Sequence, residues 1–161
     1  MKLFAKVSAA LGIVAAVAVP LALASNGAAS RTLEFVSVEQ HFSTVPQVSR
    51  QNPPQAGVRF VFQDRAYNRG AQFGKPAGAP IGRAEGVCTL IAVTKKPQAQ
   101  CLITAHVPDG QIVVAGEGNP GAKITRYAVV GGLGAYANAR GSVTGTALSP
   151  TRSLIVVHLS S

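Results

Sequence analysis

The two cysteines and three histidines are the residues of this sequence whose side chains could most readily bind a metal or act as nucleophiles or bases. The histidines, His41, His106 and His158, are scattered, and neither an H-E-x-x-H nor a G-x-S-x-G motif occurs. Cys88 and Cys101 lie thirteen positions apart on either side of a turn-like segment. These spacings argue against metal and serine-hydrolase chemistry, and we expect no metal site and no organic cofactor.

The two cysteines either form a disulfide or remain two buried thiols. Neighbouring antiparallel strands can bring Cβ atoms within bonding range of a disulfide. Closing a loop of this length would stabilise the fold by about 3 kcal/mol. Because an oxidising compartment outside the cytoplasm permits the bond, a disulfide between Cys88 and Cys101 is favoured if the chain is exported.

The glycine-rich segment 128–143, AVVGGLGAYANARGSV, is the second candidate for chemistry. It lacks the Lys-Ser/Thr of a phosphate-binding loop. Gly132 and Gly134 begin a loose G-x-G-x-x-A pattern, but the residues after it are a poor helix start and no acidic residue follows Glu117. We interpret the segment as a hairpin corner, where Gly131, Gly132 and Gly134 reverse the chain with positive φ.

The N-terminus has the pattern of an export signal. Lys2 and Lys6 precede an apolar run over 7–23, which ends in the small-x-small pattern Ala-Leu-Ala at 22–24. We expect a cleaved signal peptide, with an uncleaved transmembrane helix as the competing interpretation. Cleavage predicts a secreted, periplasmic or cell-envelope protein with no membrane association afterwards.

This interpretation divides the chain into a signal peptide (1–24), a flexible leader (25–32) and one domain (33–161). After cleavage, 13 Lys and Arg stand against 6 Asp and Glu, a net charge of +7. The basic residues are dispersed, with Lys95-Lys96 as one doublet. Without a basic stripe interleaved with aromatics we expect no nucleic-acid binding, whereas anionic cell-surface polymers remain an alternative partner.

The remaining sequence predicts an all-β protein. Period-two alternation and turn signals such as Pro108-Asp109-Gly110 predict eight short strands, and no convincing helical period appears. Eight antiparallel strands suit a closed barrel, with a two-sheet sandwich as the alternative. The expected strands are 33–41, 58–65, 83–93, 99–107, 111–116, 125–130, 140–147 and 153–159.

Several of these strands are apolar on both faces. In 99–107, for example, Cys101 and Ile103 lie on one face and Leu102 on the other. An antiparallel strand of this kind needs both faces covered. We expect an apolar lumen on the inside and an oligomer interface on the outside.

Two motifs in fixed order resemble the allene oxide cyclase and dirigent superfamily. The segment 81–89, IGRAEGVCT, contains a G-R-A-x-G element, and 130–141 contains G-G-x-G-x-[FY]-x-x-A-R-G. The segment 61–70, VFQDRAYNRG, also fits the pattern. The resemblance spans about 35–159. It implies a calycin-like eight-stranded antiparallel barrel, commonly a homotrimer, whose lumen binds an apolar reactive small molecule and steers its cyclisation or coupling.

The resemblance also implies a site on the first strand. Pro46 matches a proline that lines the cyclase cavity. Counting back without a gap places Ser37 at the position of a glutamate and Glu39 at that of a water-holding asparagine. Since Ser37, Glu39 and His41 would share one strand face, we expect Glu39 to supply a displaced catalytic carboxylate.

Further site residues follow from the second and third strands. Phe60 and Phe62 match apolar cavity positions, and Cys88 matches a cavity cysteine. Asp64 resembles an aspartate assigned to acid-base chemistry in dirigent proteins. The alternatives stay open: Asp64 as a strand cap or an ion-pair partner of Arg65 or Arg69, and Glu39 facing solvent.

Other residues of these motifs have structural roles by our interpretation. We expect Arg83 and Glu85 to form an ion pair or line an interface, Arg140 to bind backbone carbonyls, and Tyr136 to be core.

Three functions fit these observations. The first is a cyclase-like or dirigent-like barrel, an isomerase in which buried Glu39 or Asp64 moves a proton or steadies charge. The second is a non-catalytic binding protein for a lipid-like molecule. The third is a surface-associated structural protein held to anionic polymers by its charge.

Overall fold

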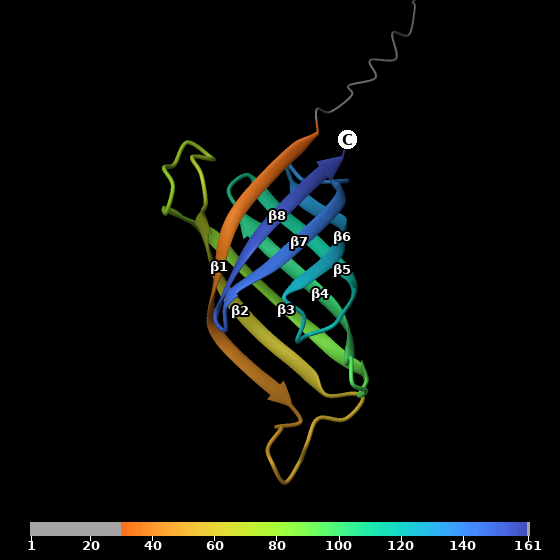
Figure 1. The fold of residues 1–161 in the computed structure, drawn as a ribbon. Coiled ribbons are helices and arrows are strands. Elements are labelled where there is room, and N and C mark those ends of the chain that lie inside the picture. Colours follow the sequence, from red (N-terminus) through yellow and green to blue (C-terminus); the bar gives the residue numbers. More distant parts are fainter. Residues whose placement is uncertain (1–29, 161) are drawn as a thin grey trace, which may run out of the picture.

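The chain forms a closed eight-stranded barrel in a computed structural model that describes residues 30–160. Every strand pairs antiparallel with its sequence neighbours, and β8 pairs with β1 to close the barrel (Figure 1). The strands are β1 Arg31–Val45, β2 Arg59–Asn68, β3 Pro80–Ala92, β4 Gln98–Val107, β5 Gly110–Gly118, β6 Ile124–Gly134, β7 Arg140–Ser149 and β8 Arg152–Ser160. The predicted all-β barrel and its eight strands are therefore confirmed.

The boundaries differ from the sequence prediction mainly in β1. That strand begins at Arg31, which pairs with Leu159, so the last two residues of the expected leader belong to the barrel. The expected signal peptide lies outside the described residues. Within 30–160 no helix is long and apolar enough to cross a membrane.

The two ends of the barrel are built differently. We call the end with the connections 69–79, 108–109 and 135–139 the closed end, and the end with 46–58, 93–97, 119–123 and 150–151 the open end. β1 to β4 reach furthest toward the open end, where the 46–58 connection extends beyond the rest of the barrel (Figure 1).

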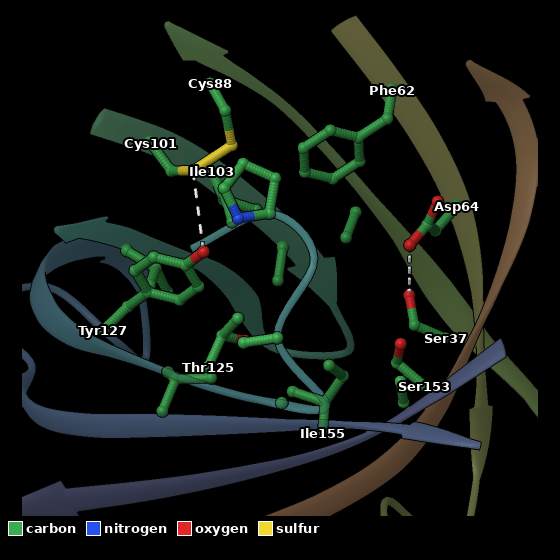
Figure 2. Close-up of a pocket in the computed structure, with 18 of the residues that line it drawn as sticks. Ser37, Phe62, Asp64, Cys88, Cys101, Ile103, Thr125, Tyr127, Ser153 and Ile155 are labelled. Carbon is green, nitrogen blue, oxygen red and sulfur yellow. Dashed lines mark hydrogen bonds between the residues drawn. A yellow bond between two sulfur atoms is a disulfide. The ribbon is translucent and has the colours of Figure 1, made fainter. Parts of the chain in front are cut away.

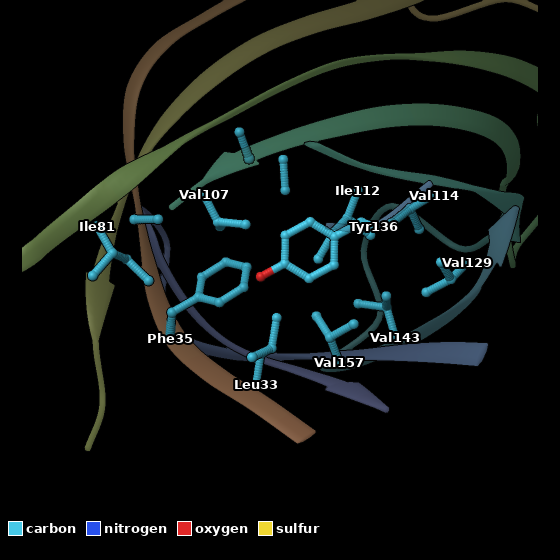
Figure 3. Close-up of a cluster of buried hydrophobic side chains, with 13 residues drawn as sticks. Leu33, Phe35, Ile81, Val107, Ile112, Val114, Val129, Tyr136, Val143 and Val157 are labelled. Atoms are coloured by element: carbon cyan, nitrogen blue, oxygen red, sulfur yellow. The ribbon is translucent and has the colours of Figure 1, made fainter. Parts of the chain in front are cut away.

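Side chains fill the interior at the closed end. Leu33 and Ile112 are 1% and 0% exposed, and Tyr136, from the connection between β6 and β7, is 2% exposed. The Tyr136 ring lies among the branched side chains and Phe35 (Figure 3), and its hydroxyl donates to the carbonyl oxygen of Pro108 at 3.4 Å. Tyr136 is thus core, as predicted, and it blocks this end of the lumen.

The chain reverses within the glycine segment, as predicted, but the turn follows the glycines instead of being formed by them. β6 continues through Gly134, and the chain reverses over 135–139, so the prediction that Gly131 and Gly132 form the turn was wrong. Positive φ occurs at Gly134 (67°) and Asn138 (65°). Gly132 is needed for a different reason: a Cβ there would collide with the carbonyl oxygens of Gln111 and Tyr136.

Candidate ligand-binding cavity

A cavity of about 730 Å³ occupies the part of the barrel interior that the closed-end core leaves unfilled. Its walls are mostly apolar and come from all eight strands. The mouth lies at the open end and is bordered by Phe42, the 119–123 connection, Leu148 and Pro150. This volume is within the range of small-molecule sites, which are commonly about 300–1,000 Å³.

Strand alternation places the predicted β2 residues in this cavity. Phe60, Phe62 and Asp64 all line it, whereas Val61, between the first two, is 38% exposed on the outer face. Successive side chains of a strand point to opposite faces, which is why three residues at a spacing of two reach one space. Phe60 also stacks on Phe42 of β1, with 6.1 Å between ring centroids.

Asp64 is the acidic side chain of the cavity wall. The Ser37 hydroxyl donates to its Oδ2 atom at 2.6 Å (Figure 2), and Ser37 is itself 4% exposed. Burial raises the pKa of Asp64, and the hydrogen bond from Ser37 lowers it by a smaller amount. The alternative in which Asp64 pairs with Arg69 is not observed, because Arg69 contacts Glu34 at 3.5 Å.

A disulfide joins Cys88 and Cys101 on the opposite side of the cavity. The two residues are directly paired across β3 and β4, and their S–S distance is 2.03 Å. Both line the cavity, so Cys88 is a wall residue without a free thiol.

Tyr127 is a cavity residue that the sequence interpretation missed. Its hydroxyl lies 3.6 Å from Cys101 Sγ (Figure 2), and burial raises its pKa. The ring packs against β5, where a Cβ on Gly118 would lie 2.9 Å from the hydroxyl oxygen and one on Gly116 would lie 3.2 Å from Cδ1. Two glycines two apart in one strand were the available signal, since such positions mark a close approach of a neighbouring group.

Glu39 and Pro46 do not line the cavity. Both are exposed, and Ser37 is therefore the polar β1 residue of the predicted set that reaches the lumen. Ser37 and Glu39 share a face of β1 as expected, because they pair with Ala66 and Asp64 in one register, but the register shift after Glu39 pairs His41 with Gln63 and removes His41 from that face. The β1–β8 ladder ends at Val38, and after the register shift Phe42 pairs with Phe62 and lines the cavity.

The remaining motif residues have the structural roles expected of them. Arg83 Nε lies 3.5 Å from Glu85 Oε2, and His106 Nε2 lies 2.8 Å from Glu85 Oε1. The His106 contact is the main cause of the lowered pKa of Glu85. Arg140 donates to the carbonyl oxygens of Val130 and Ala139 at 3.0 and 2.8 Å.

Residues 30–160 contain no group of three or more His, Cys, Asp or Glu side chains placed to share a metal ion. The polar side chains inside the cavity carry carboxyl and hydroxyl groups, and Lys123 lies at its mouth. Ser37, Asp64 and Ser153 lie on one side, and Thr125 and Tyr127 lie on the other (Figure 2). An apolar molecule in this space would therefore meet hydrogen-bonding groups at two separated positions.

Comparison with known proteins identifies the fold. No protein-family model and no curated protein matches the sequence. A pyocyanin demethylase matches the structure with a TM-score of 0.66 and 21% identity, over 81% of this chain and 100% of its own. An exo-specific intermolecular Diels-Alderase matches with a TM-score of 0.65 and 15% identity, over 82% of this chain and 97% of its own. A pterocarpan synthase dirigent protein matches with a TM-score of 0.58 and 15% identity, over 81% of this chain and 82% of its own.

The chain thus has the barrel fold of dirigent proteins and related cyclases, as the sequence motifs predicted. At these identities the likeness establishes the fold alone.

Replacing Asp64 by Asn should stabilise the protein at neutral pH. Because burial raises the pKa of Asp64 in the folded state, folding binds protons, and stability falls as pH rises through that pKa. The carboxyl is half-buried and partly screened, so we expect a gain of less than about 1 kcal/mol in the free energy of unfolding at pH 7.

Urea unfolding at pH 7 and pH 4 measures this difference. The gain should be much smaller at the lower pH, which is close to the ordinary pKa of 3.8, so that the carboxyl is only partly ionised in the unfolded state. A variant that is less stable than the parent at pH 7 but not at pH 4 would contradict the raised pKa.

Proposed function

We propose that the barrel binds an apolar, reactive small molecule in its cavity and steers the cyclisation or coupling of that molecule. The observation that carries this proposal is a carboxyl group, Asp64, in the wall of an otherwise largely apolar cavity. An unneeded half-buried carboxyl would cost stability at neutral pH. Its presence there is therefore best explained by a role toward a bound molecule.

The shape of the cavity would supply the first part of catalysis. Phe60, Phe62 and the Cys88–Cys101 disulfide form a wall that fixes the ligand in one conformation, which reduces the entropy to be lost before ring closure or coupling. The filled closed end leaves the mouth as the wide opening in the described barrel. A bound apolar molecule would displace water from this space.

Asp64 would supply the second part. With its raised pKa it keeps its proton to higher pH, so it can donate that proton to an oxygen where negative charge develops. In its ionised form it would stabilise positive charge instead. The Ser37 hydroxyl orients the carboxyl in either state. Glu39 and Pro46 lie outside the cavity and have no part in this proposal.

The named neighbours support small-molecule chemistry. The pyocyanin demethylase, the Diels-Alderase and the pterocarpan synthase dirigent protein are all named for reactions of small molecules. They share the barrel with this chain, but their substrates differ from one another. We therefore carry over a class of process, in which a barrel holds a reactive molecule, and no particular substrate.

Export and assembly complete the proposal. We propose that residues 1–24 direct export and that the disulfide forms in the oxidising compartment outside the cytoplasm. We also propose a homotrimer that uses the outer belt, an apolar row on the outer wall. Its members are paired directly across five neighbouring strands and are Val61, Val87, Leu102, Ala115 and Ala128.

Blocking the cavity should weaken the binding of an apolar probe. Ala147 lines the cavity near the mouth and is itself exposed, so Ala147→Trp should fill the entrance without disturbing the core. Fluorescence titration with neutral N-phenyl-1-naphthylamine should show at least about a tenfold weaker affinity, since the indole occupies the volume of the probe. Ala71→Trp, in the 69–79 connection at the closed end, is the matched control and should bind normally. Equal affinity in both variants would exclude the cavity as the site.

Asp64→Asn should remove turnover while leaving the cavity intact. With a polyunsaturated epoxide as probe substrate, we expect kcat to fall about 100-fold, the usual contribution of a positioned acid or base, at unchanged probe affinity. Glu39→Gln removes the other candidate carboxyl and should keep its activity. Full activity with unchanged product ratios in Asp64→Asn would contradict the assignment, and retention of the epoxide without conversion by the parent protein would favour the non-catalytic binding alternative.

A charge in the outer belt should dissociate the trimer. Leu102 is 52% exposed at the centre of the belt, and Leu102→Asp would bury a carboxylate at the proposed interface. Light scattering coupled to size-exclusion chromatography should change from trimer to monomer mass. Leu148→Asp, at a residue 56% exposed beside the mouth, should stay trimeric. A monomeric parent protein would refute the trimer.

A further inference from the structure

Large apolar side chains are exposed around the mouth of the cavity. Phe42 is 51% exposed and Leu148 is 56% exposed, and both border the opening. Val93, at the start of the connection between β3 and β4, is 53% exposed at the same end of the barrel. We call these three residues the mouth rim. They lie on different strands or connections at the open end, so more than one element contributes exposed apolar surface there.

The charges in the open-end connections are all positive. Arg50, Lys95, Lys96 and Lys123 lie in them, and these four connections contain no Asp or Glu. Lys123 also borders the cavity. The closed-end connections differ, because their charges have both signs: they contain the acidic Asp109 as well as the basic Arg69 and Lys75. The acidic residues of the strand segments toward the open end are Glu39 in β1 and Glu117 in β5.

A ligand exchanges through this same border. The core around Tyr136 fills the closed end, so a molecule in the cavity enters and leaves past Phe42, Lys123 and Leu148. An apolar ligand, if the proposed function holds, has low solubility in water and concentrates in lipid. Transfer at a lipid surface would bring it to the mouth without a passage through bulk water.

We propose that the mouth rim and the surrounding lysines dock the open end of the barrel on an anionic lipid surface. Exposed apolar side chains insert at the boundary between headgroups and acyl chains, and neighbouring lysines are attracted to anionic headgroups. The joint presence of both features favours lipid over an anionic polymer, which would need only the charge. It also favours lipid over a second copy of this chain, because two open ends would bring their lysines together.

Vesicle flotation with the full chain tests this proposal. The probes are vesicles of phosphatidylcholine alone and vesicles with 30% phosphatidylglycerol, at low and high salt, with no ligand added. Binding should occur on the anionic vesicles, weaken at high salt and be slight on the neutral ones. Intact mass spectrometry should confirm the same N-terminus in all variants, so that residues 1–29 contribute equally to each.

Two pairs of variants distinguish binding through the mouth from nonspecific binding through other charged or apolar surface residues. Lys95→Gln with Lys96→Gln and Lys123→Gln should weaken binding at least about tenfold, given the attraction of each lysine to an anionic surface. Arg65→Gln with Arg69→Gln and Lys75→Gln removes the same charge away from the mouth and should change binding less than about twofold. Phe42→Ser with Leu148→Ser should also weaken binding about tenfold, whereas Leu133→Ser, at a residue 60% exposed near the closed end, should not.

Several results would overturn the proposal. Equal binding to neutral and anionic vesicles would remove the role of the lysines, and equal losses in the rim variants and their controls would remove the role of the rim. Binding to soluble dextran sulfate that fully competes with vesicles and is unaffected by Phe42→Ser would assign the surface to an anionic polymer. Rim-dependent self-association in light scattering would assign it to a second copy. Since no ligand is present, failure here leaves the tests of cavity binding and turnover unaffected.

Discussion

The unequal filling of the barrel interior is the constraint on which the rest of this structure depends. At the closed end Tyr136 folds inward from a connection and meets Phe35 and branched side chains, so that half of the lumen is a packed core. Gly132 makes this possible, because a side chain there would collide with neighbouring carbonyl groups. A second, smaller buried cluster of Val58, Leu90 and Ala99 packs toward the open end, and the cavity occupies the interior that the two clusters leave unfilled.

The hollow half then sets the chemistry of the polar groups on its wall. Asp64 is held by Ser37 in surroundings that disfavour its charged form, whereas Glu85 on the outer wall has a lowered pKa beside His106. Two carboxyls on neighbouring strands thus have opposite pKa shifts, because Asp64 is buried in the cavity wall whereas Glu85 is hydrogen-bonded to His106 on the outer wall. Tyr127 reaches into the same space because two glycines in β5 leave room for its ring.

Local patterns in the sequence were sufficient for the barrel and for one wall of the site. The family resemblance predicted that Phe60, Phe62 and Asp64 line the cavity, where the structure places them. Two strands around a turn favoured the pairing of Cys88 with Cys101 that is observed. The register shift after Glu39 could not be predicted, since it belongs to the pairing of β1 with β2 and no local pattern of β1 marks it.

Contacts between residues far apart in the sequence explain the features that the sequence analysis predicted wrongly or missed. Gly131 and Gly132 looked like a turn, but the close approach of Gln111 and Tyr136 requires a glycine at 132 within the strand. Tyr127 gave no signal by itself, because its position beside Cys101 depends on how β4 and β6 pair with β5. Pro46 matched a family position and yet lies outside the cavity, beyond the segment where β1 leaves the wall.

The central claim is that a bound apolar molecule lies against Asp64 inside the barrel. A carboxyl-carbon NMR titration of Asp64, with and without bound N-phenyl-1-naphthylamine, tests it most directly. We predict a pKa above the ordinary aspartate range in the free protein and a further rise with the probe, since a neutral ligand removes water from the carboxyl. An ordinary or lowered pKa in the free protein, or a value that the saturating probe leaves unchanged, would contradict the account.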